Sequence, residues 1–137
     1  MSNQIGVGRS WIVTGFAFSL GILGLAFIFG PREMSAAILG LDDVEPLASL
    51  FGAALAGMGL MNWIARHSAL GGIYGRTLIS GNQAHFLIGA LTLVKHGASV
   101  GGTPAYWTLA AFYGLGAVFY AALPFSSGMR PPAVSQK

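Results

Sequence analysis

The sequence has very little charge for a chain of its length. Only 8% of its 137 residues are Asp, Glu, Lys or Arg, whereas an ordinary soluble domain is about 25% charged. So few charged side chains cannot cover the surface of a water-soluble fold of this size. This excludes a soluble globular protein and a disordered chain. The few scattered Lys and Arg residues cannot form the clustered basic face that binds nucleic acid, so we expect an integral membrane protein with no nucleic-acid partner.

Several other features that support chemistry are also missing. Cysteine is absent, which excludes disulfides, zinc–thiolate sites and iron–sulfur clusters. No carboxylate lies inside a long apolar run, which argues against a dimetal centre or a carboxylate proton relay. A bis-histidine haem needs imidazoles on different helices, but His85 and His96 share one run and His67 lies in a loop. We therefore expect no catalytic residue, no metal site, no evident cofactor and no enzymatic activity.

What the chain does have is long apolar runs, and a membrane-spanning helix needs about 20 such residues. Four runs qualify, over about residues 10–30, 47–66, 77–97 and 104–124. Lipid offers no partners to backbone N–H and C=O groups, so each run is expected to be a helix. The predicted fold class is all-α: a polytopic membrane protein with an antiparallel bundle of four transmembrane helices. Residues 1–125 would form this single domain, and residues 126–137 a flexible cytoplasmic tail.

Basic residues are distributed unequally between the two sides that these spans define. The other side carries only Arg32 and Lys95, whereas five lie on the side of the termini: Arg9, Arg66, Arg76, Arg130 and Lys137. An excess of Lys and Arg marks the cytoplasmic side, so we expect both termini in the cytoplasm and the protein in the cell (inner) membrane. The first run is longer than the core of a signal peptide, about 7–15 residues, so we expect it to be retained.

The connection between the first two spans, residues 31–46, is the longest. Apolar residues recur in it at the spacing of one helical face: Met34, Ala37, Ile38 and Leu41. This spacing predicts a short helix lying in the membrane interface. The alternative is that the connection caps the outer mouth of the bundle.

Small residues recur four positions apart inside the spans, where close approach of backbones holds membrane helices together. The pairs are Ala17 with Gly21, Gly52 with Ala56, Ala53 with Gly57, and Ala110 with Gly114. We expect them to pack the four helices of one chain against one another, and a dimer face is the alternative.

Polar side chains gather on the third run at intervals of three and four residues, which places them on one face of a helix. This stripe consists of Asn82, His85, Gly89, Thr92 and His96. Polar groups at membrane depth are costly, so the stripe is expected to face the bundle interior.

Asn62, on the preceding antiparallel run, is expected near the depth of Asn82. Together with Gln83 and His85 the two asparagines could form a hydrogen-bonded cluster. Such a cluster either fixes the register of the helices through its own bonds or binds a ligand, a proton or an ion.

Three tyrosines recur every seven residues in the fourth run. Tyr106 and Tyr120 lie near its ends and are expected to be interface anchors. Tyr113 lies at mid-membrane, where its hydroxyl needs a partner that Thr92 or Gln83 could supply. Core packing and ligand contact are both open to it. The candidates for ligand binding or a polar cluster are therefore Asn62, Asn82, Gln83, His85, Thr92, His96 and Tyr113.

Three segments, PREMSAAILGLDD, LASLFGAALAGMGLMNWIAR and LISGNQAHFLIGAL, resemble the small bacterial four-helix membrane proteins of the DoxX-like kind. The shared layout is an apolar helix, a Pro-led loop ending in a Leu-Gly-Leu turn, and a Leu-Phe-Gly-Ala helix ending in Arg. The resemblance implies a four-helix fold and an association, as a membrane subunit, with quinone-linked oxidoreductases. It carries over no functional residue.

Together these features favour a non-enzymatic accessory or structural subunit of a larger membrane complex that packs against partner helices and apolar ligands. Membrane lipids and either partner membrane subunits or further copies of the chain are its expected partners, and a lipid, quinone or pigment is its expected kind of ligand. The alternative is a small oligomeric transporter or channel with a polar path along the third helix. A membrane enzyme using His85 as acid or base ranks last, because no second ionisable group lies at its depth.

Overall fold

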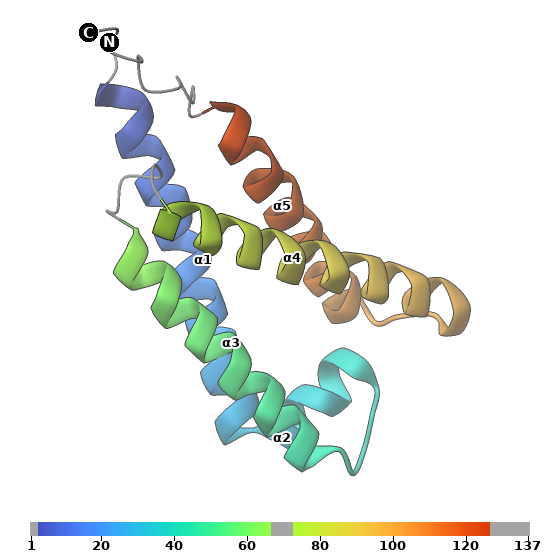
Figure 1. Cartoon of the computed structure of the whole chain (residues 1–137). Helices are drawn as coiled ribbons and strands as arrows, with labels where there is room; N and C mark the ends of the chain where they lie inside the picture. Colours follow the sequence, from blue (N-terminus) through green and yellow to red (C-terminus); the bar gives the residue numbers. More distant parts are fainter. Residues whose placement is uncertain (1–2, 67–72, 127–137) are drawn as a thin grey trace, which may run out of the picture.

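The computed structural model describes residues 3–66 and 73–126, and the regular structure in this part of the chain is entirely helical. The helices are α1 (Asn3–Phe29), α2 (Pro31–Met34), the π-helix η1 (Ser35–Leu39), α3 (Glu45–Ala65), α4 (Ile73–Val100) and α5 (Pro104–Ser126). The four long helices are each long and apolar enough to cross a membrane. The prediction of an all-α fold with four such helices and a short helix in the first connection is confirmed (Figure 1).

The helices extend beyond the apolar runs that predicted them. α1 begins at Asn3 rather than near residue 10, and α4 begins at Ile73 rather than near residue 77. The apolar run predicted over residues 104–124 ends at Pro124, but α5 continues to Ser126. A proline this close to the end removes only one backbone hydrogen bond. The rest of the predicted tail, residues 127–137, lies outside the described residues.

α1 and α3 pack backbone to backbone through glycine. A Cβ on Gly24 would lie 2.5 Å from the backbone nitrogen of Ala56, and one on Gly52 would lie 2.6 Å from the carbonyl oxygen of Gly24. A Cβ on Gly59 would lie 2.8 Å from the carbonyl oxygen of Ala17. Any side chain at these glycines would push the two helices apart, so the predicted close packing of small residues is present here.

α4 and α5 pack differently, because their glycines face aromatic rings. A Cβ on Gly89 would overlap the ring of Tyr113, and one on Gly116 would overlap the ring of Phe86. The glycines thus provide room for large side chains of the opposite helix. Gly114, a member of one predicted small-residue pair, faces open space instead.

The two helix pairs meet through aromatic side chains. The ring of Phe16 on α1 lies 5.2 Å from that of Phe86 on α4, and 5.5 Å from those of Phe112 and Phe119 on α5, measured between centroids. Figure 1 shows α1 beside α3 and α4 beside α5, with the two pairs diverging toward the α4–α5 connection. The pairs are therefore packed together at one end and separated at the other.

The first connection folds over the separated end. Gly40 ends η1 with a φ of 65°, a left-handed conformation that favours glycine. The hydroxyl of Thr103, just before α5, lies 3.2 Å from the carbonyl oxygen of Ala37 and 3.4 Å from that of Ile38. These contacts fasten η1 to the start of α5.

The helical face predicted for this connection is only partly buried. Met34 and Ile38 pack against the core, but Ala37 and Leu41 are exposed. The π-helical turn has i→i+5 bonds, so a spacing of three and four residues no longer keeps side chains on one face.

Candidate functional site

Asn62 on α3 and Asn82 on α4 form a reciprocal amide pair. The Asn62 side-chain amide donates to Asn82 Oδ1 at 2.8 Å, and the Asn82 amide donates to Asn62 Oδ1 at 3.0 Å. The Asn82 amide also donates to the carbonyl oxygen of Leu78 at 2.9 Å. Both asparagines are fully buried. The predicted proximity of the two side chains is therefore present.

Tyr120 completes this network from α5. Its hydroxyl donates to Asn62 Oδ1 at 3.1 Å, and the side chain is 1% exposed. The prediction that Tyr120 anchors the protein in the membrane interface is wrong. The network links α3, α4 and α5 with all of its side-chain polar groups engaged, so it can hold helix register but offers little to a ligand.

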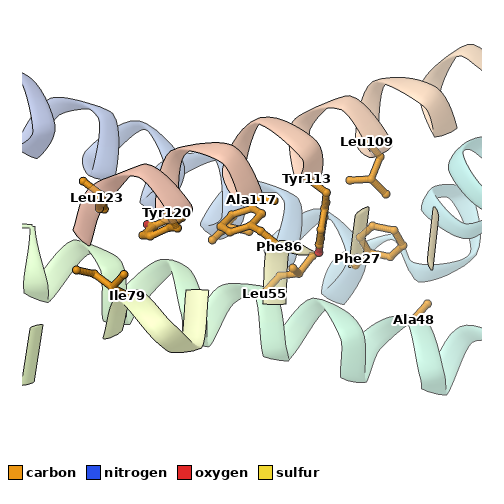
Figure 2. Close-up of a cluster of buried hydrophobic side chains, with 11 residues drawn as sticks. Phe27, Ala48, Leu55, Ile79, Phe86, Leu109, Tyr113, Ala117, Tyr120 and Leu123 are labelled. Atoms are coloured by element: carbon orange, nitrogen blue, oxygen red, sulfur yellow. The ribbon is translucent and has the colours of Figure 1, made fainter. Parts of the chain in front are cut away.

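Tyr106 was also expected to be an interface anchor, and this prediction is wrong as well. The side chain is buried, and its hydroxyl donates to the carbonyl oxygen of Leu93 at 2.7 Å. The neighbouring Trp107 is exposed instead. The repeat of seven residues thus places all three tyrosines on the inner face of α5, as Figure 2 shows for Tyr113 and Tyr120.

Gln83 and His85 do not join the asparagine network. Gln83 Oε1 and His85 Nε2 are buried, and neither has a hydrogen-bond partner among the described residues. The His85 ring lies 5.2 Å from that of Tyr113 and 5.4 Å from that of Phe86. Two residues apart on one helix, Gln83 and His85 point to different sides of the face that Asn82 occupies.

Thr92 and His96 are exposed, which overturns the prediction that the whole polar stripe faces the interior. Beyond Asn82 the face of α4 that packs against the core is formed by Phe86, Leu93 and Gly97. The physical reason is that Phe86 and Leu93 bury more apolar surface against the aromatic side chains of α5. Thr92 instead contributes to the wall of the cavity described below. His96 lies beside Tyr106, with ring centroids 6.3 Å apart.

A half-open cavity of about 420 Å³ lies between the two helix pairs, and Ser35 and Leu39 of η1 form part of its wall. Its size falls in the range of about 300–1,000 Å³ that is typical of ligand pockets. All four long helices contribute to its wall, among others through Phe27, Phe51, Leu93, Leu109 and Tyr113. The wall is almost entirely apolar, and none of the described residues that form it is charged.

Tyr113 is the buried polar side chain at this cavity that has no partner. Its ring is 3% exposed, and its hydroxyl makes no hydrogen bond to a described residue. Ser35, also at the wall, donates to the carbonyl oxygen of Pro31 at 2.6 Å and is thereby satisfied. The partners expected for Tyr113, Thr92 and Gln83, do not bond to it. Figure 2 shows the ring extending from α5 into the bundle between Phe86 and Phe27.

Charged side chains of the described residues lie away from the cavity wall. Within residues 3–66 and 73–126 there is no group of three His, Cys, Asp or Glu side chains that could hold a metal ion. The acidic residues Asp42, Asp43 and Glu45 are exposed in the connection before α3. His67, the third histidine, lies outside the described residues.

The sequence did not predict the cavity, nor that Phe27 and η1 contribute to its wall. The roles of Phe27 and of η1 at the wall depend on the angle between the helix pairs, which no local pattern encodes. Tyr120 could have been found, because its spacing of seven from Tyr113 already placed both on one face.

No family model, curated protein or solved structure matches this chain. The resemblance to DoxX-like proteins therefore stays a prediction. The function has to be inferred from the cavity, the amide network and the unpaired polar atoms.

Proposed function

We propose that this chain is a non-enzymatic integral membrane protein, an accessory subunit of a larger membrane complex, that holds an apolar molecule between its two helix pairs. The observation that carries the proposal is the apolar cavity of about 420 Å³ beside η1. An engineered apolar cavity of about 150 Å³ already takes up benzene, because its walls gain contacts that a dry void lacks.

The composition of the wall supports binding of an uncharged, largely hydrocarbon molecule. No charged side chain contributes to the wall among the described residues, and Ser35 is already bonded. Thr92 and Tyr113 are the other residues of the wall that carry a hydroxyl group. A charged group would lose its hydration without gaining a partner. The ligand classes that fit are a lipid chain, a quinone or a pigment, and the resemblance to DoxX-like proteins adds weight to the quinone.

The outward faces of the long helices support the subunit role. Large apolar side chains are exposed along all of them, for example Phe29, Leu47, Ile88 and Val118. These faces suit lipid or the helices of a partner subunit. The proposed location is the cell (inner) membrane with both termini in the cytoplasm. Single cysteines introduced into the loops of this cysteine-free chain, labelled from either side of the membrane, test that orientation.

A cavity-filling substitution tests ligand binding. Ala48 on α3 is buried at the cavity wall, and Ala54 on the same helix is exposed. We expect native mass spectrometry of the protein extracted in mild detergent to show a bound molecule of defined mass. Ala48→Phe should remove it, whereas Ala54→Phe should keep it. Retention in both variants, or no bound molecule in the wild type, would contradict ligand binding. A strictly monomeric species that carries only bulk lipid would contradict the subunit role.

The transporter alternative remains second because the polar side chains predicted to line its path do not form one continuous row. Asn62 and Asn82 are bonded to each other, while Thr92 and His96 are exposed. One chain therefore offers no continuous row of free polar groups among the described residues, and a path would require several copies. A flux across liposome membranes that is lost on replacing His85 by Ala would favour this alternative.

A further inference from the structure

The three tyrosines on the inner face of α5 differ in one respect. Tyr106 donates its hydroxyl hydrogen to the carbonyl oxygen of Leu93, and Tyr120 donates to Asn62. Tyr113, midway between them, is equally buried, but its hydroxyl has no partner among the described residues. A buried hydroxyl without a hydrogen bond is unfavourable. The exception therefore calls for an acceptor that the described residues do not supply.

Tyr113 is held in place at the cavity. Its ring lies against Gly89, where any Cβ would overlap it, and 5.4 Å from the ring of Phe86. The His85 ring lies 5.2 Å away on another side. Packed on several sides, the ring has little freedom to turn its hydroxyl toward a distant protein acceptor. Gly89 and Tyr113 both form the cavity wall. The hydroxyl oxygen itself is covered in this structure, so a ligand reaches it only when the side chains around it shift.

We propose that Tyr113 donates a hydrogen bond to the carbonyl oxygen of a neutral, chain-like lipid whose hydrocarbon part fills the cavity. This inference rests on the proposed function, since it assumes that an apolar molecule binds there. A phenolic hydroxyl is a good donor, and a carbonyl oxygen accepts without needing a donor in return. A neutral ketone, ester or amide adds little desolvation cost elsewhere along the apolar wall. A carboxylate is disfavoured, because no basic side chain among the described residues lies at the wall to pair with it.

Two probes of equal chain length separate the carbonyl from the hydrocarbon. Dodecane and 2-dodecanone labelled with ¹³C at the carbonyl are added to the full chain in lipid nanodiscs. Wild type should bind the ketone more tightly than the alkane. Tyr113→Phe should weaken ketone binding about three- to tenfold, the effect of one net hydrogen bond, and leave alkane binding unchanged. The unchanged alkane binding also shows that the variant is folded.

Infrared spectroscopy gives a second readout that a general loss of structure would not imitate. The ¹³C label separates the ketone band from the amide bands of the protein. In wild type the bound ketone band should lie at lower wavenumber than in bulk lipid, and Tyr113→Phe should return it to the bulk position. Tyr106→Phe, which alters another buried tyrosine outside the cavity wall, should keep the lowered band.

The outcomes distinguish the inference from the proposed function. If wild type binds neither probe, the proposed function fails and the inference fails with it. If wild type binds both probes equally, with the ketone band at its bulk position, the cavity takes apolar molecules but the hydrogen bond from Tyr113 is refuted. A lowered band that persists in Tyr113→Phe would also refute it.

Discussion

Tyr120 and Tyr113 lie seven residues apart on the same face of α5, and both are buried. Their hydroxyls differ in hydrogen bonding. Tyr120 donates to Asn62 at 3.1 Å, whereas Tyr113 has no partner among the described residues. At the level of Tyr120 the amides of α3 and α4 reach one another across the bundle. At the level of Tyr113 the helix pairs have separated and a cavity lies between them. The same residue at the same spacing thus closes one end of the bundle and leaves the other open to a ligand.

The difference separates the part of the bundle that holds the helices together from the part to which we assign the proposed ligand binding. Hydrogen bonds and aromatic packing hold the helix pairs together near Asn62 and Phe16. This frees the opposite end from the need for complementary packing. If this division is correct, removing a hydrogen-bonding group at the closed end should reduce stability, whereas removing the Tyr113 hydroxyl at the open end should change binding more than stability.

The largest loss of stability is expected for Asn82→Leu. The substitution removes the bonds to Asn62 and to the Leu78 carbonyl. It leaves the buried side-chain N–H₂ of Asn62 without an acceptor, while Asn62 Oδ1 still accepts from Tyr120. One interhelical bond in a membrane protein contributes about 0.6 kcal/mol, and an unpaired buried group adds about 1–3 kcal/mol. We expect the free energy of unfolding to fall by about 2–3 kcal/mol, measured by reversible unfolding with SDS in mixed micelles.

Two further variants make this prediction specific. Ser80→Leu on the exposed face of α4 should change the free energy of unfolding by less than about 0.5 kcal/mol. The double variant Asn62→Leu/Asn82→Leu should lose less than the sum of the two single variants, because it leaves no amide unpaired and only the Tyr120 hydroxyl without its acceptor. Equal and additive losses from the two single variants would mean that the amides do not act as a pair.

A smaller loss is expected for Gly89→Ala, at the open end. The new methyl group would overlap the ring of Tyr113 and displace it, since the ring is packed on its other sides. Such overpacking costs about 1–3 kcal/mol, and the displaced ring should also weaken ligand binding. Gly81→Ala on the same helix meets nothing within 4 Å and should gain about 0.5–1 kcal/mol from lower backbone entropy in the unfolded chain. Equal effects at the two glycines would contradict the fixed position of Tyr113.

Tyr120→Phe comes next in size. It removes one donor from Asn62 Oδ1, which still accepts from Asn82, so no buried group is left unpaired. We expect a loss of about 1 kcal/mol in the free energy of unfolding. The loss should disappear when the same substitution is made in an Asn62→Leu background. If it persists there, the Tyr120 hydroxyl contributes through some group other than Asn62.

These regions were not equally accessible to sequence reasoning. Long apolar runs predict the four spans, because hydrocarbon forces the backbone into helices whatever the side chains do. The proximity of Asn62 and Asn82 follows from counting residues in two antiparallel helices. Neither prediction requires knowledge of how the other helices pack.

The inner face of α4 could not be predicted in the same way. Intervals of three and four residues lead from Asn82 either through His85 and Thr92 or through Phe86 and Leu93. The structure places Phe86 and Leu93 on the inner face because they pack against aromatic side chains of α5. That packing depends on residues far apart in the chain. The cavity has the same origin, because it follows from the angle between the helix pairs.

The smallest effect on stability, and the sharpest contrast, is expected for Tyr113→Phe in ligand-free protein. The substitution removes a buried hydroxyl that has no partner and keeps the ring that packs against Phe86 and Gly89. We expect the free energy of unfolding to stay unchanged or to rise by up to about 1 kcal/mol, the opposite of Tyr120→Phe. Saturating 2-dodecanone should then stabilise wild type more than the variant, because only wild type donates the hydrogen bond. A ligand-free loss equal to that of Tyr120→Phe would show that the two hydroxyls are equally engaged within the chain, and the distinction between the closed and the open end would fail.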